Sequence, residues 1–140
     1  MQSSLAITID VEEDSWDRFD AGANALDNIE RIPILQELFD RYGAVPTYLL
    51  TYPVLNDRRS LNLFESLYER GRCELGVHCH PWNTPPASGA SKQADTYLCN
   101  LPRLVVFEKI ETMTNIFRTN LGFSPACFRR ARLSISFVTG

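Results

Sequence analysis

Hydrophobic positions along the chain alternate between short strand-like runs and helix-like repeats. The apolar run in residues 5–12 predicts a buried strand that ends in acidic residues. From residue 29 to residue 42 the apolar positions recur every three or four residues, which indicates a helix. Pro33 predicts either a kink in that helix or its true start, and Gly43 predicts its end.

The same alternation continues to residue 128. It predicts strands at residues 46–51, 73–79 and 126–128, and helices at residues 61–68 and 101–121. The resulting β-α-β-α-β-α-β order is typical of an α/β fold with a parallel sheet covered by helices. No repeat or linker interrupts it, so we expect residues 1–140 to form a single domain. The loop at residues 81–93 is rich in Pro, Gly and Ser, and its length indicates a functional loop.

The composition narrows the range of partners. The chain has 140 residues, 44% of them hydrophobic, and a net charge of -3, which favours one ordered domain and argues against a basic nucleic-acid surface. No stretch approaches the roughly 18 apolar residues of a membrane span, and the N-terminus does not resemble a signal peptide. We therefore expect no membrane partner and a cytoplasmic location. The four cysteines form no CxxC pair, and we expect reduced, mostly buried thiols.

Asp10 and Glu12 form the first candidate for chemistry. They lie two residues apart at the end of the first predicted strand, so both carboxylates project from one face. Ligands of parallel α/β folds collect at the carboxyl ends of the strands. Acidic residues in this place more often cap the next helix or face solvent, so this pair alone does not indicate a site.

The two histidines of the chain, His78 and His80, shift the balance toward a metal site. They too lie two residues apart at the end of a predicted strand, and Cys79 between them should face away. Two imidazoles and one carboxylate make a three-ligand set that zinc enzymes use, leaving a position for water. Cobalt, nickel or iron also accept these donors, so the pattern predicts a divalent metal, with zinc the first choice.

Two further positions lie beside the predicted site. Trp82 could stack on a sugar ring or fill the core near the strand ends, and the sequence does not separate these roles. Arg129, at the end of the last predicted strand, is placed to hold Asp10 through paired hydrogen bonds. Arg132 is the alternative partner for Asp10, and a basic surface turn is the other explanation of both arginines.

Three segments together resemble the polysaccharide deacetylase family, in its N-terminal portion. ITIDVEE resembles the first motif, ELGVHCHPWNTPP the histidine motif and CFRRARLSIS the arginine motif. The resemblance implies a distorted (β/α) barrel and metal-dependent hydrolysis of acetyl groups on N-acetylated sugars, which makes the expected partner a carbohydrate. It implies that Asp10 is the catalytic base and Arg129 orients it. Glu12, His78 and His80 would hold the metal, with His78 alternatively a neighbour of the ligands.

The length agrees with part of such a barrel. A complete (β/α) barrel typically needs more than about 200 residues, so we expect the N-terminal half of a deacetylase-type barrel with parallel strands, truncated after residue 140. The family takes its general acid from a later histidine, and no histidine follows His80. Two other hypotheses stay open: an inactive remnant that binds metal or carbohydrate without catalysis, and a flavodoxin-like domain in which the histidines have no role.

Overall fold

A parallel sheet of four strands forms the centre of the computed structural model, which describes residues 5–22, 24–87 and 93–132. Within these ranges the strands are β1 (Thr8–Val11), β2 (Thr47–Leu50), β3 (Glu74–Cys79) and β4 (Phe128–Arg130). Their order across the sheet is β1-β2-β3-β4, and every neighbouring pair is parallel.

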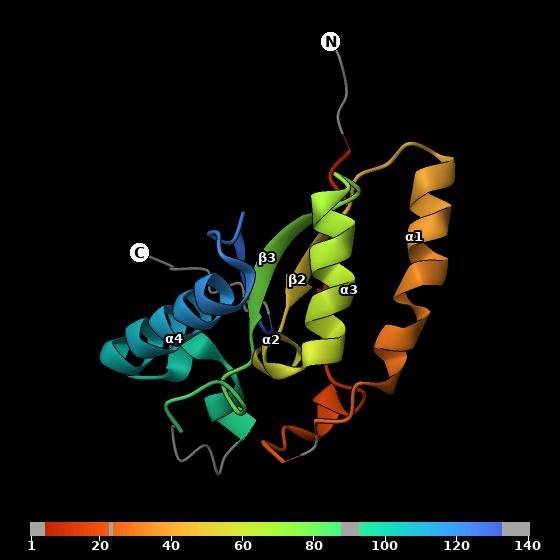
Figure 1. Ribbon diagram of the computed structural model, residues 1–140. Helices are drawn as coiled ribbons and strands as arrows, with labels where there is room; N and C mark the ends of the chain where they lie inside the picture. Colours follow the sequence, from red (N-terminus) through yellow and green to blue (C-terminus); the bar gives the residue numbers. More distant parts are fainter. Residues whose placement is uncertain (1–4, 23, 88–92, 133–140) are drawn as a thin grey trace.

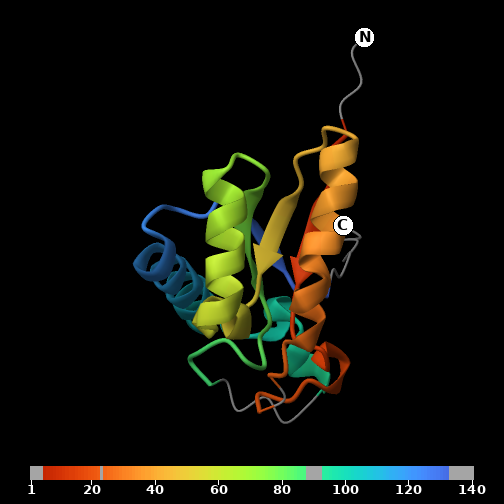
Figure 2. The same ribbon diagram turned by 45° about the vertical axis from the view of Figure 1, so that its right-hand side comes forward.

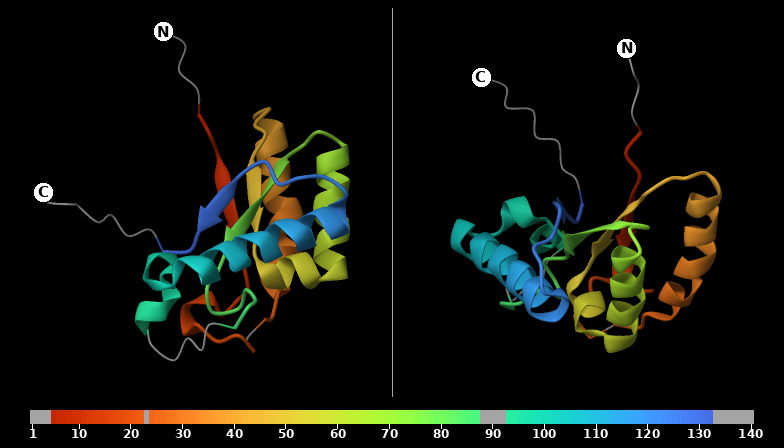
Figure 3. Two further views of the ribbon diagram at one scale, coloured as in Figure 1. Left: turned by 90° about the vertical axis from the view of Figure 1, so that its left-hand side faces the viewer. Right: turned by 45° about the horizontal axis from the view of Figure 1, so that its top comes forward.

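Helices connect the strands in sequence. The α-helices are α1 (Ile32–Arg41), α2 (Tyr52–Asn56), α3 (Arg58–Glu69) and α4 (Arg103–Leu121). Short 3-10 helices are η1 (Trp16–Arg18), η2 (Asp27–Arg31), η3 (Gln93–Thr96) and η4 (Leu98–Asn100). Figures 1 and 2 show α3 in front of β2 and β3, with α1 and α4 flanking it. All three long helices lie on the same side of the sheet (Figure 3).

A sequential strand order with helices on one side is the arrangement of a half barrel. The predicted α/β class and partial (β/α) barrel are therefore confirmed. The flavodoxin-like hypothesis is wrong, because that fold places its first strand between the second and third and covers both faces with helices. None of the helices in the described ranges combines the length and apolarity that crossing a membrane requires.

The two faces of the sheet carry different side chains. Tyr48, Leu50 and Val77 project toward the helices and join the buried core, where the Tyr48 ring packs against Phe64. Strand side chains alternate between faces, so the intervening positions point into the concave side. On the concave side lie Leu49 of β2 and, toward the carboxyl ends of the strands, polar side chains.

Local signals explain where the helices begin and end. Pro33 lies in the first turn of α1, which confirms that the helix begins near it. The Asp57 side chain accepts a hydrogen bond from the Ser60 backbone N–H and caps α3. Gly122 ends α4 with a φ of 81°, a left-handed conformation that favours glycine. The short helix α2 directly after β2 was not predicted, because Tyr52–Asn56 holds too few residues to show a helical period.

Some predicted burial was wrong. Leu5 is 85% exposed, because β1 is an edge of the described sheet and begins only at Thr8. In α4 the apolar Leu104 and Phe107 are exposed, whereas Lys109 is fully buried. The hydrophobic spacing therefore indicated the wrong face for the first half of this helix.

The cysteines divide evenly rather than being mostly buried. Cys73 and Cys79 are buried, while Cys99 and Cys127 are exposed. Cys79 faces away from the two histidines, as its position in the strand predicted: its Sγ lies 3.8 Å from Thr84 Oγ1 within the core. Burial raises the pKa of the Cys79 thiol to about 11, so this sulfur stays protonated near neutral pH.

Gly76 in the middle of β3 provides a test of how closely the strands pack. A Cβ there would lie 2.7 Å from both the Cys127 carbonyl oxygen and Leu49 Cδ2. We expect Gly76→Ala to lower the free energy of unfolding by about 1–3 kcal/mol, since overpacking forces the backbone to shift. Urea unfolding followed by tryptophan fluorescence measures this loss. The control is Gly22→Ala, whose Cβ would make one ordinary contact at 3.4 Å; equal stability of the two variants would contradict the prediction.

Candidate metal centre

The strand register brings the predicted site residues to one end of one face. In the strand register Asp10 lies opposite Leu49 of β2, and His78 lies opposite Arg129 of β4. Glu12 and His80 lie two residues beyond Asp10 and His78, so all five side chains share the concave face. The loops that follow β1 and β3 lie together at the lower end of the view in Figure 1, where the carboxyl ends of the strands meet.

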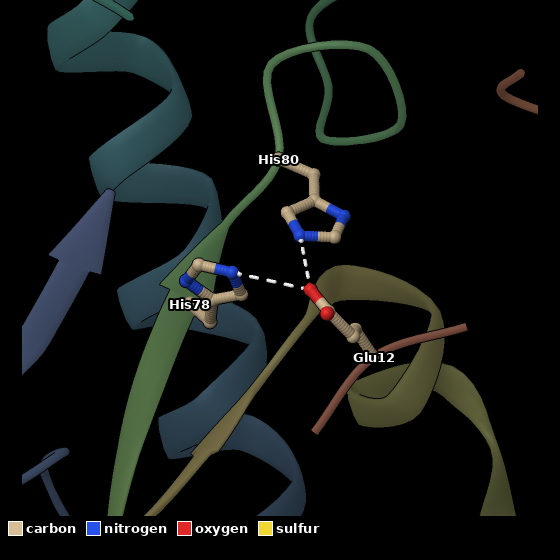
Figure 4. A group of neighbouring side chains, drawn as sticks. All are labelled: Glu12, His78 and His80. Atoms are coloured by element: carbon tan, nitrogen blue, oxygen red, sulfur yellow. Dashed lines mark hydrogen bonds and ion pairs between the residues drawn. The ribbon is translucent and has the colours of Figure 1, made fainter. Parts of the chain in front are cut away.

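Glu12, His78 and His80 form a compact cluster of possible metal ligands. Glu12 Oε2 lies 2.9 Å from His80 Nε2 and 3.4 Å from His78 Nε2. One ligand atom from each residue falls within 4.8 Å of the others. Figure 4 shows both imidazoles, one from β3 and one from the segment just after it, turned toward the same carboxylate oxygen.

The second nitrogen of each histidine is held by an oxygen acceptor. His80 Nδ1 lies 2.8 Å from Glu13 Oε1, and His78 Nδ1 lies 3.3 Å from the Arg129 carbonyl oxygen. Without metal, His80 Nε2 also shares a 2.9 Å hydrogen bond with Glu12 Oε2. With a metal bound, Nδ1–H would donate in both rings and leave the lone pair of Nε2 facing the cluster. Ligating histidines usually have such a partner on the other nitrogen. The geometry thus groups His78 with Glu12 and His80 as a possible ligand.

Glu13 is the site residue that the sequence did not reveal. An acidic residue just after a strand suggests a solvated loop, yet Glu13 is only 1% exposed. Its Oε1 also accepts a 2.7 Å hydrogen bond from Asn83 Nδ2, and its Oε2 accepts one from Thr51 Oγ1. The only sequence signal was a second acid directly after Glu12, and solvated loops share that pattern.

Charge coupling inside the cluster shifts three pKa values. Burial alone would raise the pKa of Glu12, but hydrogen bonds and charge interactions with both histidines outweigh it and hold that pKa at about 2. The pKa of Glu13 is lowered too, because His80 outweighs its burial. Burial would lower the pKa of His80, yet the two carboxylates raise it above its ordinary value. Without metal, a proton on His80 therefore holds the two acids together.

Asp10 and Arg129 form an ion pair beside the cluster. Arg129 Nη1 donates to Asp10 Oδ1 at 2.8 Å, and Arg129 Nη2 donates to Thr8 Oγ1. The other carboxylate oxygen, Asp10 Oδ2, lies 4.0 Å from His78 Nε2. The expected contact of Arg129 with Asp10 is thus present, but with one hydrogen bond to the carboxylate instead of the expected pair, because Nη2 turns to Thr8. The alternative partner, Arg132, donates to Thr96 Oγ1.

Trp82 forms a wall of the site. Its ring stacks on His80 with a centroid distance of 4.2 Å, and Phe19 packs edge-on against it at 5.0 Å. It is 9% exposed, so most of the indole is buried. The core-filling role is therefore present, and the remaining exposed part borders the pocket.

A pocket of about 650 Å³ opens above the cluster. Its lining combines the candidate ligands and the ion pair with four aromatic rings and further arginines: Asp10, Glu12, Trp16, Asp17, Phe19, His78, His80, Trp82, Tyr97, Arg129, Arg130, Ala131 and Arg132. A space of this size accommodates a small organic ligand.

Lys109 supports the loop that carries one side of the pocket. Its ammonium group is fully buried and donates to the Thr84 carbonyl oxygen and, at 2.6 Å, to that of Pro86. Burial lowers the pKa of this lysine. The two hydrogen bonds attach the loop after His80 to α4, and the same loop carries Asn83 to its contact with Glu13.

The donor set fits a divalent cation. Two imidazole nitrogens and a carboxylate oxygen converge, and buried oxygen acceptors orient both rings, which are the features expected of a zinc-type site with protein ligands on one side. The expected divalent metal site is thus present as a possible site in Glu12, His78 and His80. The same donors suit zinc, cobalt, nickel and iron.

No family model, curated protein or solved structure matches this chain in comparisons of its sequence and fold. The resemblance to the polysaccharide deacetylases therefore rests on the three motifs of the sequence alone.

Glu13 can be tested through metal affinity. We expect Glu13→Gln to weaken zinc binding by about 10–100-fold, because the His80 ring loses the carboxylate that orients it and increases its basicity. Competition with a chromophoric chelator measures the dissociation constant. Glu37→Gln, at an exposed position of α1, is the matched control and should bind as the original protein does. Equal affinities in the two variants would show that Glu13 does not support the site.

The metal-free protein should be most stable between about pH 4.5 and pH 6.5. The stabilisation from Glu12 is complete above its ordinary pKa of 4.5 and is lost as the pH falls toward about 2. The stabilisation from His80 is complete below 6.5 and is lost as the pH rises through its raised pKa. We expect the loss on the acid side, from Glu12, to be on the order of 2 kcal/mol.

Urea unfolding after chelator treatment, repeated across the pH range, measures this dependence. His80→Gln should remove the decline on the alkaline side while leaving ordinary acid unfolding. An original protein whose stability is the same at mildly acidic and alkaline pH would contradict the predicted coupling.

Proposed function

We propose that this chain carries the catalytic metal site of a hydrolase that removes acetyl groups from N-acetylated sugars. One observation supports this most: the Glu12, His78 and His80 cluster shares a pocket with the Asp10 carboxylate, which Arg129 holds beside it. A purely structural metal site has four protein ligands and no neighbouring base. Here three possible ligands and Asp10 Oδ2, the oxygen that Arg129 Nη1 does not engage, border an open pocket.

The residues can divide the work of amide hydrolysis. A divalent cation, when bound by Glu12, His78 and His80, would polarise the carbonyl oxygen and lower the pKa of water. Asp10 would accept the proton of the attacking water through Oδ2, the oxygen that Arg129 Nη1 does not engage. Arg129 orients this carboxylate through a hydrogen bond to its other oxygen. A positioned base of this kind contributes roughly 10²–10⁴ in rate.

The pocket wall supports a sugar as the substrate. Trp16, Phe19, Trp82 and Tyr97 border the space above the cluster, and Trp16 is half exposed. Aromatic rings beside polar groups suit a ligand that has both apolar ring faces and hydroxyl edges. The resemblance of the three motifs to polysaccharide deacetylases points to the same substrate class, with an acetamido group as the bond that is cleaved.

Binding without catalysis is the second candidate function. Both histidines of the sequence lie in the metal cluster, whereas the resembled family uses a further histidine as general acid. A metal- or carbohydrate-binding protein would need the cluster and the pocket but not the Asp10–Arg129 pair.

Replacing Asp10 separates the two functions. We expect Asp10→Asn to lower acetate release from N-acetylglucosamine oligomers by about 10²–10⁴-fold, since the base is lost, while zinc content stays unchanged. Acetate is measured enzymatically and zinc by mass spectrometry on the same samples. Asp20→Asn, an exposed position, is the matched control.

Normal turnover in Asp10→Asn would exclude this mechanism. Bound zinc in the original protein with no acetate release from any oligomer would favour binding without catalysis.

A further inference from the structure

Arg132 is an ordered arginine of the pocket that the proposed reaction does not use. Arg129 already pairs with Asp10, so Arg132 has no part in orienting the base. Its Nη1 donates to Thr96 Oγ1 at 2.9 Å. Its guanidinium carbon lies 4.3 Å from the Tyr97 ring centroid and 5.0 Å from that of Phe19. These contacts hold the charged group at the pocket wall.

The packing around Arg132 brings together three separate segments. Phe19 follows η1, Thr96 and Tyr97 lie at the end of η3, and Arg132 follows β4. Cation–π contacts with two rings favour one placement of the guanidinium. The N–H donors lie in the plane of the guanidinium, where they can meet a planar oxygen pair.

Within the described part of the chain, no carboxylate forms an ion pair with Arg132. Arg59, Arg72 and Arg129 each have a carboxylate partner within 4.0 Å. Arg132 has none among the residues that the structure describes, and its one recorded side-chain acceptor is the neutral hydroxyl of Thr96. A cationic edge beside aromatic rings therefore borders the same pocket as the metal cluster.

We propose that Arg132 binds a carboxylate carried by the ligand, so that the pocket selects acidic sugars over neutral ones. This proposal rests on the proposed function, in which the ligand is a sugar, and specifies in addition that the sugar carries a negative charge. A carboxylate matches the two parallel N–H groups of a guanidinium edge. Asp10 and Glu12 lie at the metal cluster and disfavour an anion there, whereas the part of the lining beside Phe19 and Tyr97 carries the Arg132 guanidinium.

Glucuronate and glucose are a matched pair of probes, because they differ only in the carboxylate. We expect the zinc-loaded protein to bind glucuronate more tightly than glucose, and Arg132→Met to reduce this preference by about tenfold, the size of one charge-assisted hydrogen bond. Arg132→Lys keeps the charge without the planar fork and should retain part of the preference. Arg41→Met, at an exposed position of α1, removes the same charge and should leave the preference for glucuronate unchanged. Isothermal titration measures each affinity.

Coordination of glucuronate to the zinc itself is distinguished by the same variants. If the preference survives in both Arg132→Met and Arg132→Lys, the carboxylate binds at the metal or at another arginine, and the proposal is overturned. It is also overturned if the original protein does not prefer glucuronate. Zinc content and acetate release are measured on the same preparations. Absence of acetate release together with an Arg132-dependent preference would reject the deacetylase function while leaving the anion site in place.

Discussion

Alternation of side chains along four parallel strands in register is the constraint on which the rest of this structure depends. It sends Tyr48, Leu50 and Val77 toward the helices, where their burial contributes the main hydrophobic stabilisation. The same alternation sends Glu12 and His78 to the opposite face. Because the strands are parallel, their carboxyl ends meet at one end of the sheet, and the polar side chains gather there. Core and candidate site are thus two consequences of one backbone arrangement.

Because its charged groups are buried, the candidate site requires ion-pair and hydrogen-bond partners for each of them. Glu13 and His80 are almost completely inaccessible to solvent, and buried charges are tolerated only when they are paired and hydrogen-bonded. The structure meets that requirement with Thr51 and Asn83 on Glu13, and with Lys109 holding the loop on which Asn83 lies. Each partner comes from a different segment, so the orientation of the His80 ring depends on the packing of β2, α4 and the loop between β3 and η3.

The open side of the pocket is built by loops rather than by the sheet. Trp16 and Phe19 follow β1, Tyr97 follows η3, and Arg132 follows β4. The rigid strands hold the groups proposed for chemistry, while the loops supply the groups proposed to select the ligand. This division is common in β/α folds, because connecting segments can vary without disturbing the strand ends.

The sequence by itself determined the alternation of strands and helices. It also determined that Asp10 and Glu12 share one strand face, as do His78 and His80. Both depend on short periods, two for strands and about 3.6 for helices, which neighbouring residues carry. Only the tertiary structure decided that Glu13 supports His80, that Lys109 is buried in α4, and that Arg129 rather than Arg132 meets Asp10. These contacts join residues between 23 and 119 positions apart. Local patterns of polarity carry no record of such distant partners, so an acid or a lysine with a buried partner has the same appearance in the sequence as a solvated one.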